Sequence, residues 1–221
     1  IVENRRLLGS GSHAFIVNGA AKPAAPGWSE TMADTHWAHL AGNVTGSDIG
    51  YYFPQTAAIK AVREARTGSW ADVDDGSSTT PITRNYLRMG FEHGSNPANA
   101  TYQYVLLPGR SVRRVGQYAE SPQISVLSNN GNVQAVAETT LGITAANFWA
   151  DGIHSAGLMT SNKKSCVLVQ QSGAFIDVAV SDPTQANTGT IDLQITLAEN
   201  SLVSADAGVS VTSLAPAIAM T

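Results

Sequence analysis

The sequence predicts an all-β chain in which a large antiparallel β-sandwich portion is followed by a smaller C-terminal β-sandwich. Short stretches of alternating apolar and polar residues recur along the whole chain, separated by clusters of Gly, Asn, Asp and Pro. The 221 residues, 43% of them hydrophobic, suffice for one large or two modest β domains. The alternation is interrupted near Ala119–Pro122. We therefore expect two domains, comprising residues 1–121 and 122–221.

The expected first domain contains four recognisable strands. His13–Gly19 is predicted as a strand that follows a hairpin turn at Gly9–Ser12. Gly50–Pro54 is predicted to end at its proline, which has no N–H to donate to a neighbouring strand. Ile82–Phe91 alternates over its whole length, and Thr101–Leu107 follows after a polar, turn-rich stretch. The pattern is typical of antiparallel strands that expose one face.

The expected second domain begins with two hairpins. The first turn is Asn129–Asn132, where Asn-Gly tolerates the positive φ of tight hairpin turns, and the second is Gln171–Gly173. The strands predicted for this domain are Ile124–Ser128, Val133–Glu138, Ser165–Gln170, Ala174–Ser181, Thr190–Leu197 and Val209–Ser213.

Composition excludes several classes of function. With 13 Lys+Arg against 17 Asp+Glu, the formal net charge is −4, whereas a nucleic-acid partner favours a basic face. For the same reason, this chain is not expected to supply most of a cleft for an acidic polysaccharide. The sequence contains no run of about 18 apolar residues, the pattern that would predict a membrane span. The single cysteine, Cys166, allows no intrachain disulfide and is expected to be a buried thiol on a strand.

Six segments in one order resemble the β-rich C-terminal part of the polysaccharide lyases that cleave hyaluronan, chondroitin or xanthan. The resemblance extends from Glu3–Leu8 to about Leu197. Its segments are WAHLAGNVTGSDIGYYFP (Trp37–Pro54), RTGSWADVD (Arg66–Asp74), HGSNPANATYQYVLLPG (His93–Gly109), LSNNGNVQAV (Leu127–Val136), AANFW (Ala145–Trp149) and VSDPTQ (Val180–Gln185).

The resemblance implies a secreted enzyme in which a helical toroid precedes stacked β-sheets. The family's catalytic Asn, His, Tyr and Arg lie in the helical part, and an N-x-E-N motif of the early β part completes the cleft. This chain has neither. We therefore expect a fragment that starts inside a sheet domain, and no catalytic or substrate-binding residue is assigned to it. Its expected partner is the upstream helical and β segment of the same protein, or a second copy.

Ala57–Arg66 gives two conflicting indications. Its residues favour a helix, with apolar Ile59 and Val62 three positions apart. The resemblance instead makes it a strand that leads into the GSWADVD segment. Because tertiary context overrides propensity, we predict a strand.

Three groups of side chains are candidates for chemistry. His36 and His39 would hold a metal if they shared one helix face, but a structural role around Trp37 is favoured. His93 is interpreted as a turn histidine that bonds to backbone groups. The acidic cluster of Asp72, Asp74 and Asp75 is interpreted as solvated loop carboxylates, with structural calcium as the alternative. No metal ligand or cofactor is assigned.

Aromatic residues offer a further binding hypothesis, because exposed rings in a row would stack on sugars. Packing is favoured for Trp37, Trp70 and Trp149, which lie within the family-like segments. The remaining candidates are Trp28, Tyr51 and Tyr52.

The sequence thus indicates the β-portion of a secreted polysaccharide lyase, a scaffold and cleft wall for a helical catalytic domain. The expected parent reaction is β-elimination from a uronic-acid-containing polysaccharide, and the chain alone is expected to be inactive. The alternative is a non-catalytic carbohydrate-binding or structural β-sandwich module.

Overall fold

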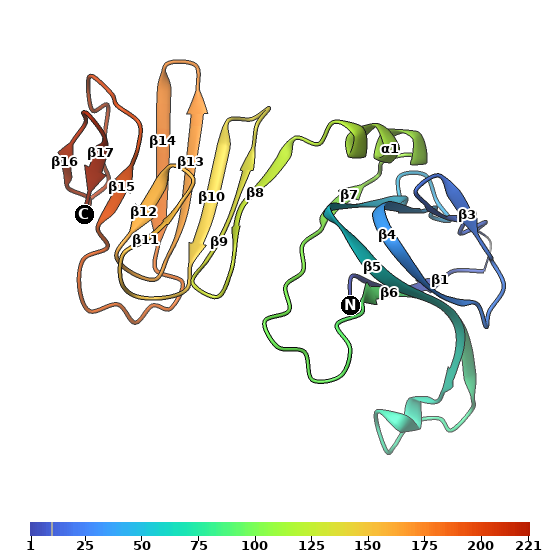
Figure 1. The fold of residues 1–221 in the computed structure, drawn as a ribbon. Helices are drawn as coiled ribbons and strands as arrows, with labels where there is room; N and C mark the ends of the chain where they lie inside the picture. Colours follow the sequence, from blue (N-terminus) through green and yellow to red (C-terminus); the bar gives the residue numbers. More distant parts are fainter. Residues whose placement is uncertain (10) are drawn as a thin grey trace. The chain divides into compact units, whose positions relative to one another are not determined.

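A computed structural model describes residues 1–9 and 11–221, which form two compact units, Ile1–Pro122 and Gln123–Thr221 (Figure 1). With 48% strand and 5% helix, the all-β prediction is confirmed. The turn predicted at residues 9–12 includes Ser10, which lies outside the described residues.

The first unit contains one antiparallel sheet of seven strands. The order runs from β1 through β6, β5, β4 and β2 to β3, and β7 pairs with the beginning of β5. The strands are β1 (Glu3–Leu7), β2 (Phe15–Val17), β3 (Ala20–Lys22), β4 (Ser29–Leu40), β5 (Ile49–Gly68), β6 (Ile82–Phe91) and β7 (Val105–Pro108). A short 3-10 helix, η1 (Trp70–Asp72), lies in the connection from β5 to β6.

Strand β5 corrects one prediction and confirms another. Residues 57–66 form a strand, as the resemblance implied, but β5 does not end at Pro54. It continues for 20 residues, and Figure 1 shows it curving along its length. Regular pairing with β4 is interrupted between Tyr52 and Ala57, so Pro54 lies where no ladder hydrogen bond is required of it.

The curvature of the sheet closes the core of the first unit. Tyr51 of β5 donates a hydrogen bond to Glu3 of β1. In the register of the sheet, however, Glu3 lies opposite Met89, and Met89 lies opposite Ala61. Tyr51 and Ala61 would be about 33 Å apart along a straight strand. One sheet therefore folds over to supply both layers of the sandwich. Its core comprises Phe15, Val17, Met32, Ala38, Leu40, Tyr51, Phe53, Ile59, Ala61, Leu87 and Met89.

A helix that the sequence analysis did not predict, α1 (Val112–Glu120), follows β7. Its Val115 side chain is fully buried and lies against Gly50, where an added Cβ would come within 2.2 Å of it. The ring of Tyr118 contacts that of Tyr52 edge to face, at 5.5 Å between centroids. Tertiary packing on β5 thus stabilises a helix of only nine residues, a length that is marginal in isolation.

The second unit is a sandwich of two five-stranded antiparallel sheets. One has the order β14-β13-β10-β9-β8 and the other β11-β12-β15-β17-β16. Their inner faces share a core that includes Phe148, Val169, Met159 and Ile195. The strands are β8 (Ile124–Asn129), β9 (Val133–Glu138), β10 (Ile143–Phe148), β11 (His154–Ala156), β12 (Met159–Ser161), β13 (Ser165–Ser172), β14 (Phe175–Ser181), β15 (Leu193–Ile195), β16 (Val211–Ser213) and β17 (Ile218–Met220).

Both predicted hairpins form, but the turn of the first is not stabilised in the expected way. Gly173 takes a φ of +61° between β13 and β14. In the β8–β9 turn, neither Asn130 nor Gly131 has a positive φ. The Asn130 Oδ1 atom instead accepts hydrogen bonds from the backbone N–H groups of Asn132 and Val133, both at 2.9 Å. A side-chain acceptor therefore organises this turn.

Asp182 organises the VSDPTQ segment that follows β14. Its Oδ1 accepts hydrogen bonds from the N–H and hydroxyl of Thr184, and its Oδ2 accepts from the N–H groups of Ala186 and Asn187. The hydroxyl of Thr184 and the N–H of Asn187 hold the pKa of Asp182 at about 2, below its ordinary 3.8. The ionised carboxylate is thus the form that the folded chain favours.

We expect this arrangement to give a pH-dependent contribution to stability. A depressed folded pKa stabilises above the unfolded value, and the contribution is lost as pH falls from about 4 through about 2. Asp182→Asn should lower the urea midpoint of the second unit at pH 6, and the difference from the wild type should shrink toward pH 2. Thr184→Val should raise the pKa of Asp182 and reduce the difference. A deficit of equal size at both pH values would contradict this account.

Among the described residues, no helix is long and apolar enough to cross a membrane.

Candidate functional site

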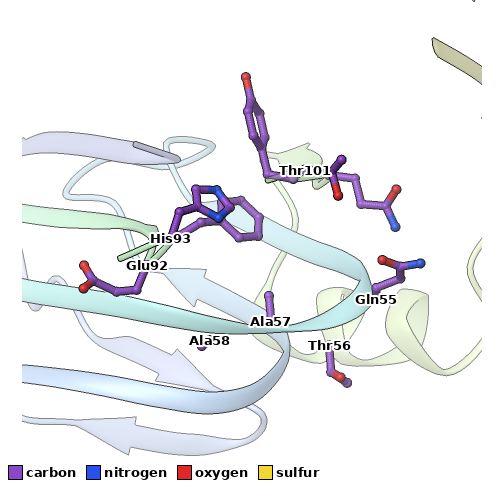
Figure 2. Close-up of a pocket in the computed structure, with 10 residues that line it drawn as sticks. Gln55, Thr56, Ala57, Ala58, Glu92, His93 and Thr101 are labelled. Carbon is purple, nitrogen blue, oxygen red and sulfur yellow. The ribbon is translucent and has the colours of Figure 1, made fainter. Parts of the chain in front are cut away.

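One concave site of the first unit lies where β5 bends. Its volume is about 210 Å³. Figure 2 shows Ala57 and Gln55 on β5, His93 beyond the end of β6, and Thr101 on the returning loop. The lining residues come from three segments that the fold brings together: Gln55, Thr56, Ala57 and Ala58; Phe91, Glu92 and His93; and Thr101, Tyr102 and Gln103.

A cluster of rings forms one wall of this pocket. Phe91 lies at its centre, contacting the Phe53 ring edge to face at 5.8 Å on the core side. The His93 ring stacks on Phe91 at 5.9 Å with an interplanar angle of 6°, and Tyr102 contacts Phe91 at 5.7 Å. Tyr104 packs beside both Phe91 and Tyr102. The cluster joins the core to an exposed surface, since Tyr102 is 63% exposed.

The structure changes the interpretation of His93. A turn histidine bonded to backbone was expected, but the contact that fixes its ring is the stack on Phe91. The sequence analysis singled out the His93–Gly109 segment but missed its partners on β5. Gln55 and Thr56 had no signal of their own, because only the bend of β5 brings them beside the loop.

The two candidate metal histidines do not share a face. They lie on strand β4, where an odd spacing places side chains on opposite sides, so His36 is exposed and His39 is buried. The His39 Nε2 atom lies 3.1 Å from both Asp48 Oδ2 and the Arg110 backbone oxygen. Asp48 in turn accepts a hydrogen bond from the Gly42 N–H. His39 therefore links β4 to two connecting segments, which is a structural role.

Two carboxylates of the acidic cluster accept hydrogen bonds in the loop that contains η1. Asp72 accepts a hydrogen bond from the Ser69 N–H at 2.6 Å and closes the capping box of η1, and Asp74 accepts one from the Ser77 hydroxyl. In the part of the chain that the structure describes, no three His, Cys, Asp or Glu side chains gather as a metal site would require.

Packing was wrongly predicted for two tryptophans. Trp70 is 62% exposed on η1, and Trp149 is 48% exposed just after β10. Trp37 is half-buried beside Gly116 of α1, as expected for packing. Cys166 lies on strand β13 as predicted, but it is only partly buried.

Burial displaces the pKa of Arg63, which sequence reasoning did not single out, and of Tyr51, a candidate for stacking on sugars that is instead fully buried. Arg63 is 2% exposed, its guanidinium donates to the His13 backbone oxygen, and burial lowers its pKa. Burial and the hydrogen bond to Glu3 raise the pKa of Tyr51. Tyr51 belongs to the first core, and buried Arg63 ties β5 to the segment at His13.

Both units match domains of one protein family. The first 119 residues match the polysaccharide lyase family 8 super-sandwich domain. Residues 125–191 match the family's C-terminal beta-sandwich domain.

Individual relatives extend the match to the whole chain. A xanthan lyase of Bacillus sp. is 46% identical over 225 residues, covering 100% of this chain and 24% of that protein. A hyaluronate lyase of Thermasporomyces composti is 35% identical over 83% of the chain and 23% of its own length.

Solved structures agree with these matches. A Paenibacillus xanthan lyase superimposes with a TM-score of 0.96 at 47% identity, over 100% of this chain and 21% of that one. A Streptomyces coelicolor chondroitin AC lyase, solved with chondroitin sulphate, gives 0.81 at 30% identity over 99% of this chain and 26% of that one. The chain thus spans about a quarter of the length of these relatives, and it belongs to polysaccharide lyase family 8.

Proposed function

We propose that this chain is the C-terminal β-portion of a secreted polysaccharide lyase that cleaves a uronic-acid-containing polysaccharide. The observation that carries the proposal is the match of the whole chain to a xanthan lyase at 46% identity, supported by family matches in both units. Residues 1–121 would be the end of the central lyase sandwich, and residues 122–221 its small C-terminal domain.

The proposed reaction is a β-elimination. A base takes the C5 proton beside the uronate carboxylate, and the electron pair left on C5 forms the C4–C5 double bond as the 4-O glycosidic bond breaks. The leaving oxygen receives a proton, and a neutral donor stabilises the enolate-like charge that develops on the carboxylate. We assign these roles to residues of a helical catalytic domain outside this chain, and the proposal invokes no cofactor.

The role proposed for this chain is that of a scaffold and cleft wall. Strand β1 lies at one edge of the sheet in the first unit. It pairs with β6 on one side, and among the described residues no strand pairs with its other side. Edge strands present N–H and C=O groups that a further strand can pair with. We propose the upstream β segment of the same protein as that partner, with a second copy as the other arrangement. A formal charge of −4 argues against nucleic acid.

The proposal predicts that activity needs both parts of the protein. The 221-residue chain should give no rise in ultraviolet absorbance from unsaturated product with hyaluronan, chondroitin or xanthan. Adding the remainder of the protein as a separate polypeptide should restore turnover on one of them, with the two parts eluting together in size-exclusion chromatography. The remainder alone serves as the control. Steady turnover by the chain alone would refute the proposed division of roles.

A non-catalytic carbohydrate-binding module is the second candidate, favoured by the exposed ring of Tyr102 beside polar side chains in one pocket. It predicts sugar binding by the chain, with no turnover when the remainder is added.

A further inference from the structure

The pocket at the bend of β5 has an apolar floor and polar ends. Ala57 and Phe91 pack against the core of the first unit and form the floor. Figure 2 shows Gln55 at one end of the pocket, whereas the Glu92 carboxylate points away from the other labelled side chains. A volume of about 210 Å³ leaves room for one six-membered sugar ring. A few polar groups around an apolar surface are typical of small-molecule sites.

The aromatic wall suits the C–H face of a sugar. The exposed Tyr102 ring is braced by Phe91 at 5.7 Å and by Tyr104 at 6.4 Å, so its orientation is set before any ligand arrives. An aromatic face carries partial negative charge, and the axial C–H groups of a pyranose carry the complementary partial positive charge. A ring already held in place loses little conformational entropy on binding.

The polar rim suits hydroxyl groups. The amides of Gln55 and Gln103 each offer donors and an acceptor, and the Thr101 hydroxyl offers both. Adjacent sugar hydroxyls also donate and accept, so each can pair with such a group.

Charge decides the class of sugar. None of the ten lining residues is Lys or Arg. A uronate or sulfate group that entered the pocket would be desolvated without a Lys or Arg to pair with, which costs free energy. A neutral pyranose needs no such partner.

We propose that the pocket formed by Gln55–Ala58, Phe91–His93 and Thr101–Gln103 binds one neutral pyranose unit of a polysaccharide. Tyr102 supplies the stacking surface, and Gln55 and Gln103 bind the hydroxyls. The inference goes beyond the proposed function, because it assigns to this chain a subsite for an uncharged sugar that is separate from the elimination at a uronate. Sugar binding at this pocket requires no catalytic activity. Failure of the sugar titration would therefore be distinguishable from failure of the lyase assay that tests the proposed function.

The first test is a nuclear magnetic resonance titration of the isotope-labelled 221-residue chain with cellotetraose and, separately, mannotetraose. Saturable shifts are expected at the backbone amides of the three lining segments for one of the two sugars. Tyr102→Ala should weaken binding at least tenfold, and Tyr102→Phe, which keeps the ring, should stay within about twofold. Trp70→Ala removes an equally exposed ring elsewhere and should change nothing.

Gln55→Ala provides a second variant that leaves the ring cluster intact, and it should weaken binding severalfold even if Tyr102→Ala lowers the unfolding temperature. Two results would overturn the proposal. One is the absence of saturable shifts with either sugar up to about 20 mM, and the other is binding that both variants leave unchanged.

The second test concerns charge. A hyaluronan tetrasaccharide, which carries uronates, should bind at least tenfold more weakly than the better neutral sugar. Equal binding of the acidic and neutral sugars by the wild type would show that the assignment to an uncharged unit is wrong.

Discussion

Replacing Phe148 with alanine should destabilise the second unit by about 3–5 kcal/mol, the range for removing a buried phenylalanine. Phe148 is 1% exposed on the inner face of β10, between Val133 on β9 and Ser165 on β13. Its ring fills the space between the two sheets, and neighbouring backbone cannot collapse into the cavity without breaking the ladders. Because a typical domain is stable by only 5–15 kcal/mol, the loss should be a large fraction of the total.

The adjacent residue provides a matched control. Trp149 is larger but 48% exposed, so Trp149→Ala should cost less than about 1 kcal/mol. Urea denaturation followed at the amides of β9, β10 and β13 would measure both variants. The backbone hydrogen bond from Trp149 to Asn132 survives the substitution, so it does not complicate the comparison. Equal losses for the two variants would contradict the placement of the core.

Replacing Gly50 with alanine should displace α1 and destabilise the first unit by about 1–3 kcal/mol. A Cβ at this position would lie 2.2 Å from a methyl carbon of Val115, which is fully buried. The conflict is steric, because Gly50 is not among the residues with positive φ. Hydrogen exchange at the α1 amides should accelerate in step with the loss of stability.

A double-mutant cycle isolates the cause. Val115→Ala removes the clashing methyl groups, so the pair Gly50→Ala with Val115→Ala should be more stable than the sum of the single changes predicts. Gly90→Ala on β6 is the control, since a Cβ there would meet its nearest neighbour at an ordinary 3.4 Å. Strict additivity of the two substitutions would mean that α1 does not rest on Gly50.

Local pattern predicted much of the fold. Ile82–Phe91 alternates in sequence and forms β6 over the same residues. Turn residues located both hairpins of the second unit, even though Asn130 acts through its side chain rather than through positive φ. Propensity alone would have made residues 57–66 a helix, and pairing with β4 and β6 overrides it. The helix α1 escaped prediction because its stability comes from packing on β5.

The candidate site was only half visible in the sequence. The segment beginning at His93 stood out, and it supplies one side of the pocket. Gln55 and Thr56 lie about 40 residues earlier and carry no pattern that links them to it. The exposure of Trp70 was missed for a related reason. A tryptophan in a recognisable sequence segment does not reveal whether that segment forms an exposed loop after a strand.

The sequence by itself determined the all-β class, the order of most strands and the family, because alternation and turn chemistry are local properties and the family's segments follow one another along the chain. Only the tertiary structure decided how one sheet forms both layers of the first unit. The pairing of Tyr51 with Glu3 and the bend of β5 beyond Pro54 depend on contacts between residues far apart in the chain. The same bend places Gln55 beside His93, so the proposed sugar site exists only once the sheet has folded over.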